Sequence, residues 1–394
     1  MGVKGCSLFF VSTLFVILSG CSDNISHSDI TQITIDVKQI DQCLADANII
    51  RTEGEHKLLK LETNDKCIIG NISDIVFQDN LLYIVDDLSS CILVFNTDGR
   101  FEFKIDKRGR AHNEYVEMTD VHISNNNVWV LDNIGCKIVV YDLKGAFVRS
   151  IDISSVWGHH LFVSDNNIFL VNKWSETSSG NYRFFVLDKN GKITDRLLPF
   201  TTEDCNRYFA EEKAYAVTDN VFFICYPSDN TIYQTTSNGE IKPFLYVNFG
   251  RQTMPEKHRT IGAVEGLRQG LGNKYIWGID RISSSSRYIV LSYKFQAMPY
   301  NIIYDLKTGL HSNVNSTRVD GWYNLALTDF FLTRNYIVSY RSADDLLTTY
   351  DYILKNKINP KNSFEQRVAD VVKDIKYEDN GILIMYQLKD MNDE

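Results

Sequence analysis

The side chains that could recognise a ligand are a few aromatic and basic residues outside the regular parts of the sequence. Exposed aromatic rings stack on the apolar face of a sugar, and the candidates for that role are Trp174, Tyr182 and Trp322. Arg259 and Arg268 lie in a basic stretch that could bind an acidic group. Each candidate also has a structural interpretation, as an aromatic wedge between sheets or as part of a solvated loop. We expect these five residues to be the first places to look for a ligand.

The sequence carries no signature of catalysis or of metal binding. It lacks G-x-S-x-G and H-E-x-x-H motifs, and its many carboxylates single out no acid–base pair. His159 and His160 are adjacent, and neighbouring side chains of a strand point to opposite faces, so we do not expect them to share a metal. The glycine-rich run at residues 266–274 lacks the Gly-Lys-Ser/Thr ending of a phosphate loop. We therefore expect no cofactor and no metal, and an enzyme only if carboxylates gather from separate parts of the chain.

Charge and cysteine content narrow the class of protein further. The formal net charge of −9 argues against a nucleic-acid partner, which requires a basic surface. Six cysteines follow residue 21 at scattered spacings, without a C-x-x-C pair: Cys43, Cys67, Cys91, Cys136, Cys205 and Cys225. Buried free thiols are therefore favoured over a disulfide scaffold.

The residues above must be positioned by a repeat of about 46 residues. Its first element is an Asn/Asp turn that leads into a short apolar run, as in Asp79–Asp86 and Asn125–Asp132. Its second element is a turn that ends in glycine, and Gly99, Gly145 and Gly191 follow one another at intervals of 46 residues. Four short antiparallel strands in such a period are typical of a propeller blade. The apolar faces of a blade are buried only when it lies between two neighbouring blades.

Counting the second strand of each repeat predicts an all-β, six-bladed propeller, with seven blades as the alternative. The counted positions are Tyr83, Trp129, Phe169, Phe223, Tyr288 and Tyr336. We expect the run Ile382–Tyr386 to close the ring beside an N-terminal strand near Ile33–Val37. An insertion falls near residues 250–275, either over the mouth of the propeller or as a solvated excursion. Helices are expected only near residues 41–47, 255–267 and 363–373.

Three segments resemble NHL-like propellers and, more closely, six-bladed propeller lipoproteins of Bacteroidetes. They are residues 72–101, Lys107–Tyr115 and Glu378–Lys389. The second resembles an inter-blade motif, so we expect Glu114 to accept hydrogen bonds from backbone amides and Tyr115 to pack against the next blade. His112-Asn113 and Gly381 depart from the family pattern, but these residue types also suit turns. The resemblance implies placement in the cell envelope and no established chemistry.

The N-terminus looks like the signal peptide of a bacterial lipoprotein. Lys4 precedes an apolar run that is short for a membrane span and ends in Leu18-Ser19-Gly20-Cys21. This resemblance implies a signal peptide at 1–20, lipid on Cys21, a tether at 21–31 and one propeller domain at 32–390. An ordinary signal peptide or an uncleaved helix is the alternative. The expected location is the outer membrane, facing the cell surface or the periplasm, with the lipid in the membrane.

Three functions remain open on the sequence alone. The favoured one is a non-catalytic binding or scaffolding module for a protein or glycan ligand. The second is a glycan-active hydrolase or lyase with carboxylates in the central funnel, since propellers host many chemistries. The third is a purely structural component of the envelope.

Overall fold

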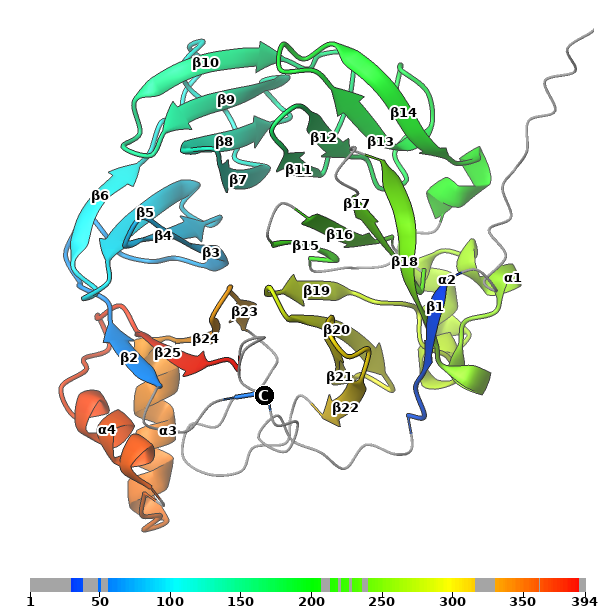
Figure 1. The fold of residues 1–394 in the computed structure, drawn as a ribbon. Coiled ribbons are helices and arrows are strands. Elements are labelled where there is room, and N and C mark those ends of the chain that lie inside the picture. The colour runs from blue at the N-terminus through cyan, green and yellow to red at the C-terminus, as the bar shows by residue number, and fades with distance from the viewer. Residues whose placement is uncertain are drawn as a thin grey trace, which may run out of the picture.

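The computed structural model describes residues 30–37, 49–50, 56–206, 213–218, 221–226, 229–235, 240–315, 330–360 and 362–389. Within them, six small antiparallel sheets stand around a common axis (Figure 1). This arrangement is a six-bladed β-propeller, as the repeat count predicts.

The first three blades follow one another along the chain without interruption. Blade 1 consists of β3 (Ile72–Gln78), β4 (Leu81–Asp86), β5 (Cys91–Asn96) and β6 (Phe101–Ile105). Blade 2 consists of β7 (Asp120–Ser124), β8 (Asn127–Asp132), β9 (Lys137–Asp142) and β10 (Phe147–Asp152). Blade 3 consists of β11 (His160–Val163), β12 (Ile168–Val171), β13 (Tyr182–Leu187) and β14 (Ile193–Pro199). In each blade the first strand lies next to the axis (Figure 1).

The other three blades have the same order of strands with additions. Blade 4 consists of β15 (Tyr215–Thr218), β16 (Val221–Cys225), β17 (Thr231–Thr235) and β18 (Ile241–Asn248). Blade 5 consists of β19 (Arg281–Ser284), β20 (Tyr288–Phe295), β21 (Met298–Asp305) and β22 (His311–Asn315). Blade 6 consists of β23 (Phe331–Leu332), β24 (Tyr336–Arg341), β25 (Ile382–Gln387) and β2 (Lys57–Lys60).

The ring closes within blade 6, where the C-terminal strand β25 lies between β24 and the N-terminal strand β2. The C-terminal half of this closure is as predicted, but its N-terminal partner is not the segment at Ile33–Val37. Strand β1 (Thr31–Thr34) instead pairs in parallel with β18 and adds a fifth strand to blade 4. Periodicity alone cannot distinguish two short apolar strands that precede the first repeat, and Leu58-Leu59 is the one that reaches the seam.

Turn chemistry explains why these residues fold into hairpins. Asp79, Asn80, Asn125 and Asn126 have φ between 50° and 61°, the left-handed conformation that tight hairpin turns require. Gly145 also has positive φ (80°), and its turn residue Asp142 accepts hydrogen bonds from two backbone amides that follow it. The repeat seen in the sequence is therefore a repeat of turns.

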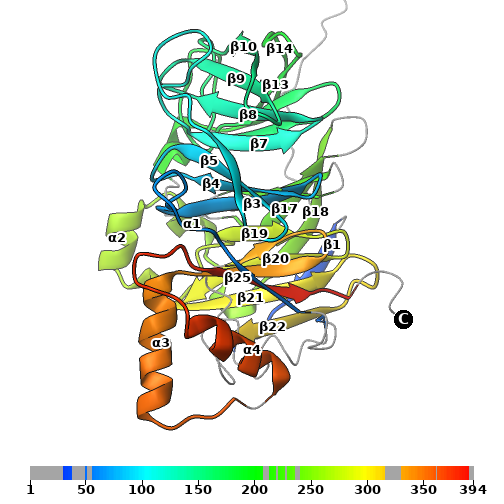
Figure 2. The same ribbon diagram turned by 90° about the vertical axis from the view of Figure 1, so that its left-hand side faces the viewer.

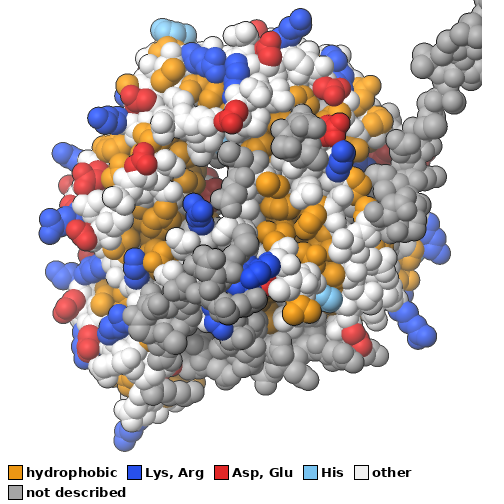
Figure 3. Space-filling view, viewed as in Figure 1, with side chains coloured by type: hydrophobic (Ala, Val, Ile, Leu, Met, Phe, Trp, Pro, Cys, Tyr) orange, Lys and Arg blue, Asp and Glu red, His pale blue; other side chains and the backbone are white. Residues whose placement is uncertain are grey.

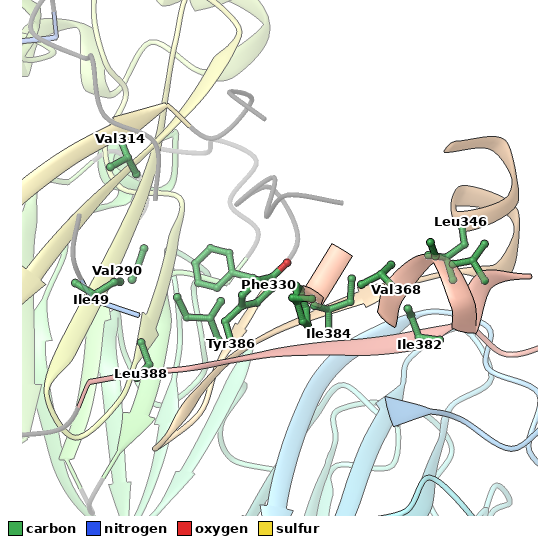
Figure 4. Close-up of a cluster of buried hydrophobic side chains, with 14 of the residues drawn as sticks. Ile49, Val290, Val314, Phe330, Leu346, Val368, Ile382, Ile384, Tyr386 and Leu388 are labelled. Carbon is green, nitrogen blue, oxygen red and sulfur yellow. The ribbon is translucent and has the colours of Figure 1, made fainter. Parts of the chain in front are cut away.

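The hydrophobic core is divided among the interfaces between blades. Six clusters of buried side chains each draw on two neighbouring blades. Figure 4 shows the cluster between blades 5 and 6, which extends from Val290 of blade 5 past Tyr386 of blade 6 to Val368 and Leu346 of the outer helices. Burying one such aliphatic side chain contributes about 1.5–3 kcal/mol to the stability of the fold, so each blade depends on both of its neighbours for its stability.

The helices lie outside the ring (Figures 1 and 2). Helices α1 (Glu256–Arg259) and α2 (Ala263–Arg268), with the 3₁₀ turns η5 (Gly250–Gln252) and η6 (Leu271–Asn273), form the insertion, and η4 (Thr202–Asn206) follows blade 3. Helices α3 (Ala343–Lys355) and α4 (Ser363–Val372) project beside blade 6 (Figure 2). The predicted helices at 255–267 and 363–373 are confirmed, α3 was not predicted, and the helix predicted at 41–47 lies outside the described residues. No helix in the described part of the chain combines the length and apolarity needed to cross a bilayer.

The inter-blade segment at Lys107–Tyr115 is a linker, as predicted. The Ala111 amide donates a hydrogen bond of 3.0 Å to Glu114, and the fully buried Tyr115 donates from its hydroxyl to the Ser90 carbonyl at 2.8 Å. None of the cysteines among the described residues forms a disulfide, and Cys67, Cys91 and Cys225 are buried.

Candidate functional site

Two cavities lie along the axis of the ring. The larger has a volume of about 850 Å³ and opens where the innermost strands begin. Its charged side chains come from all six blades and from the start of helix α3: Asp74, Asp87, Asp120, His160, Lys213, Arg281, Arg341 and Asp345. The smaller has a volume of about 220 Å³ and lies toward the other ends of the same strands. A concave cavity of about the size of the larger one is the usual form of a ligand site. We call the larger cavity the axial pocket.

The axial pocket and the smaller cavity meet at a level lined by six shared residues. These are Asp74, Val121, Lys213, Tyr215, Arg281 and Phe331. The Lys213 ammonium lies 2.6 Å from the Asp74 carboxylate, and the two residues belong to blades 4 and 1, on opposite sides of the six-bladed ring. This ion pair therefore crosses the axis and forms a floor beneath the axial pocket.

A second bond between non-adjacent blades involves Asp120, the first residue of β7. Tyr215 of blade 4 donates its hydroxyl proton to Asp120 at 2.7 Å, and the Leu161 amide donates to the other carboxylate oxygen at 2.7 Å. The His160 ring lies against the Tyr215 ring, with centroids 4.2 Å apart, and its Nδ1 is 3.9 Å from Asp120. Burial raises the pKa of Asp120, and these neighbours oppose that effect.

The pKa of the Tyr215 phenol is raised well above its usual value by burial, and the Asp120 carboxylate beside it adds to the effect. The phenol therefore stays protonated at neutral pH and keeps donating to Asp120. The arrangement of Asp120, His160 and Tyr215 can hold a proton or bind a polar group inside the pocket.

Basic residues of the axial pocket come from blades 4, 5 and 6. Lys213 and Arg281 are bridge partners, so two cationic side chains start from adjoining backbone positions at the floor. Arg281 donates to the Phe330 carbonyl at 2.6 Å, and Arg341 contacts Asp345 at 3.1 Å. Figure 3 shows the opposite face of the ring, away from helices α2 and α3, and several Lys and Arg side chains are also visible near its centre.

The smaller cavity has a different character. Apolar side chains of the innermost strands line most of it, including Ile75, Phe77, Ile282 and Leu332. His122 also lines it, and burial lowers the pKa of this histidine to about 4, so its ring is neutral at physiological pH. The two ends of the axis therefore differ, with charged groups at one and apolar groups at the other.

The aromatic candidates Trp174 and Tyr182 do not line either cavity. Trp174 is 7% exposed and packs between blades 3 and 4 against Tyr226, with Arg183 over its ring at 4.3 Å. Its burial does not suit an exposed platform for a sugar, and its position agrees with the aromatic-wedge interpretation. Tyr182 is partly buried against the cluster between blades 2 and 3.

The basic candidates Arg259 and Arg268 lie in the insertion outside the ring (Figure 1). Arg259 is largely buried and lies 3.8 Å from Asp229, and Arg268 is exposed and lies 3.8 Å from Glu265. No described residue of the insertion lines the axial pocket or the smaller cavity, so a roof over either is not observed in that part of the chain. A Cβ on Gly266 would lie 2.2 Å from the Trp277 ring, which explains this glycine by close packing rather than by phosphate binding.

Two predicted site residues lie outside the described residues, and several residues of the axial pocket were not predicted. Trp322 and Cys21 are outside the described ranges. The sequence analysis missed Asp74, Asp120, Lys213 and Tyr215. A signal for them was present, because polar residues open or precede the first strand of several repeats, and that strand lines the axis. The structure places no group of three metal-binding side chains together within the described ranges.

The fold and the axial pocket define a class: a six-bladed propeller with a polar cavity closed across its axis. The chain belongs to the family described as "Domain of unknown function (DUF4934)", whose model matches residues 32–387. A comparison with curated proteins finds no match.

Several solved structures are similar to this chain. A "putative exported protein" from Bacteroides fragilis is 20% identical, with a TM-score of 0.73, over 91% of this chain and 100% of that one. A "member of duf4221 family" from Bacteroides vulgatus is 12% identical, with a TM-score of 0.49, over 85% and 97% of the two chains. A streptogramin B lyase is 13% identical, with a TM-score of 0.41, over 72% and 77%. The first similarity, at 20% identity, shows the fold alone, and the other two carry no argument.

Proposed function

We propose that this protein is an exported lipoprotein of the cell envelope that binds a ligand in its axial pocket without turning it over. The observation that carries the proposal is the pocket itself, about 850 Å³ in volume and lined by charged side chains from separate blades. Such a convergence depends on closure of the whole ring, and a purely structural protein has no need of it.

The envelope location is supported by two observations. The sequence Leu18-Ser19-Gly20-Cys21 suits lipid attachment at Cys21, and a similarly folded Bacteroides fragilis protein is described as exported. Replacing Cys21 by Ala should release the protein from the membrane fraction, because several acyl chains together provide durable attachment. Unchanged sedimentation with membranes would contradict the lipid anchor.

Binding in the axial pocket can be tested by closing its mouth. Asn71 is exposed and lines the pocket, so Asn71→Trp should obstruct entry without disturbing the core. The full chain in detergent is screened against a glycan array and a peptide library, and the variant should lose at least about tenfold in affinity for any captured ligand.

The matched control is Lys144→Trp, which places the same side chain on an exposed turn of blade 2. This variant should bind like the wild type. A ligand bound equally well by the wild type and by Asn71→Trp would show that the axial pocket is not the site.

A glycan-active hydrolase or lyase is the second candidate, favoured by one specific observation. Asp120 has a raised pKa and lies in the axial pocket beside His160 and Tyr215, which together resemble the components of an acid–base site. Prolonged incubation with a captured glycan should give no new reducing ends if the protein only binds. Their appearance, and their loss in Asp120→Asn, would favour the enzyme.

A further inference from the structure

The floor of the axial pocket determines which part of a chain-like ligand can enter. The Asp74–Lys213 ion pair joins opposite blades across the axis at 2.6 Å, and the Tyr215–Asp120 hydrogen bond joins blades 4 and 2 beside it. A polymer that passed along the axis would have to break these two contacts. The site is therefore shaped for the end of a chain rather than for its middle.

The charges of the axial pocket are close to balanced. Lys213, Arg281 and Arg341 face the carboxylates Asp74, Asp87, Asp120 and Asp345. Two of the cations contact carboxylates directly, Lys213 with Asp74 and Arg341 with Asp345. A charged ligand group that bound to Lys213 or Arg341, or to their carboxylate partners, would have to separate such a pair and leave one partner uncompensated inside the pocket, which is costly.

A hydroxyl group avoids this cost, because it donates to a carboxylate and accepts from a cation at the same time. Closely spaced hydroxyls can therefore bond to both members of a pair without changing the charge of the pocket. The Phe331 and Tyr340 rings also line the pocket and offer apolar surface to the face of a sugar ring.

We infer that the axial pocket recognises the terminal residue of an uncharged oligosaccharide, an inference that rests on the proposed binding function. A peptide is the less suitable chain, because each of its ends carries a charge, whereas the end of a neutral oligosaccharide carries only hydroxyls. Bonding across the axis and the balance of charge thus point to the same ligand.

The test uses the full chain in detergent and four linear hexasaccharides as probes: maltohexaose, cellohexaose, mannohexaose and xylohexaose. Each is presented with one free end and with both ends coupled to the support. Oligogalacturonate and sialyllactose serve as acidic probes, and a peptide library is screened in parallel. At least one neutral probe with a free end should bind, and coupling both ends should weaken binding at least about tenfold.

The salt dependence of the affinity and a double variant of the ion pair at the floor of the pocket provide two further readouts. Raising NaCl should change the affinity for the neutral probe less than about twofold, since no net charge is recognised. The double variant Asp74→Ala/Lys213→Ala should still fold, because both charges leave together, and it should discriminate less between free and coupled ends.

The outcomes separate the two proposals. Tighter binding of an acidic probe or of a peptide, or equal binding of free and coupled ends, overturns the saccharide-end inference and leaves the binding function intact, provided that Asn71→Trp abolishes the binding. Capture of no saccharide and no peptide overturns both.

Discussion

Blades 1–3 and blades 4–6 are built on the same four-stranded plan, but they contribute opposite charges to the axial pocket. The first three blades supply Asp74, Asp87, Asp120 and His160, and the last three supply Lys213, Arg281 and Arg341, while Asp345 of helix α3 adds a carboxylate from the second half. The regular half repeats its turns at nearly constant spacing, whereas the other half carries an insertion, an added strand and two outer helices. The site therefore exists only when the two halves meet across the axis.

The regularity of the first half has a physical basis in its linkers. In blades 1 and 2 a fully buried aspartate at the end of the second strand, Asp86 or Asp132, accepts hydrogen bonds from three backbone amides around the adjoining linker. In blade 6 the amide side chain of Asn380 takes part of this role and accepts from the Ile69 amide. The carboxylate anchors of blades 1 and 2 thus hold the linkers of the part of the chain where the repeat length is constant.

The largest expected effect is the loss of such an anchor in the regular half. Asp132→Ala leaves the amides of Val116, Glu117 and Gly135 without their acceptor, and each buried unsatisfied donor costs about 1–3 kcal/mol. We expect the free energy of unfolding, measured with urea, to fall by about 4 kcal/mol.

Asp132→Asn is the matched control, because it keeps an accepting oxygen and should lose less than half as much stability. A loss below about 1 kcal/mol in Asp132→Ala would show that the carboxylate does not hold the linker.

A pH effect of intermediate size should arise from His122 in blade 2. Burial lowers the pKa of His122 to about 4 in the folded protein from 6.5, so the unfolded chain binds more protons between these values. Stability therefore rises from pH 4 to 6.5 and is lost on acidification, by about 3 kcal/mol for this group.

Urea unfolding of the wild type and of His122→Gln at pH 7 and at pH 4.5 measures this contribution. The variant should show a smaller difference between the two pH values. The same pH dependence in both proteins would exclude His122 as its source.

The smallest effect is expected where the two halves meet. Asp74→Asn and Lys213→Met should each cost about 1–2 kcal/mol, a modest value because the two side chains are 30% and 24% exposed and water screens the pair. The double variant should regain part of the loss, giving a coupling energy of about 1 kcal/mol in a double-mutant cycle. Strictly additive losses would indicate that the ion pair does not join the halves.

The sequence predicts the fold well because its signals are local. The Asn/Asp turns, the glycines near residues 99 and 145, and the C-terminal strand all report nearest-neighbour chemistry, and each was confirmed. The N-terminal partner of the seam was wrong because pairing across more than 300 residues leaves no local trace. Helix α3 was missed although Ser342 caps it by accepting from the Asp345 amide.

The site was harder to predict because its members are distant in sequence. Asp74 and Lys213 are 139 residues apart, and Asp120 and Tyr215 are 95 apart. Trp174 drew attention by residue type, yet ring closure buries it between blades. Residue type identifies what a side chain could bind, but only the closed ring decides which side chains share a cavity.

The most direct test of the axial pocket as a binding site is a crystal structure of the protein with the tightest-binding oligosaccharide from the screen. We predict density for one terminal sugar above the Asp74–Lys213 pair, within hydrogen-bonding distance of Asp120 or Arg341. Density confined to the outer strands or to the insertion, with the axial pocket empty, would contradict the account.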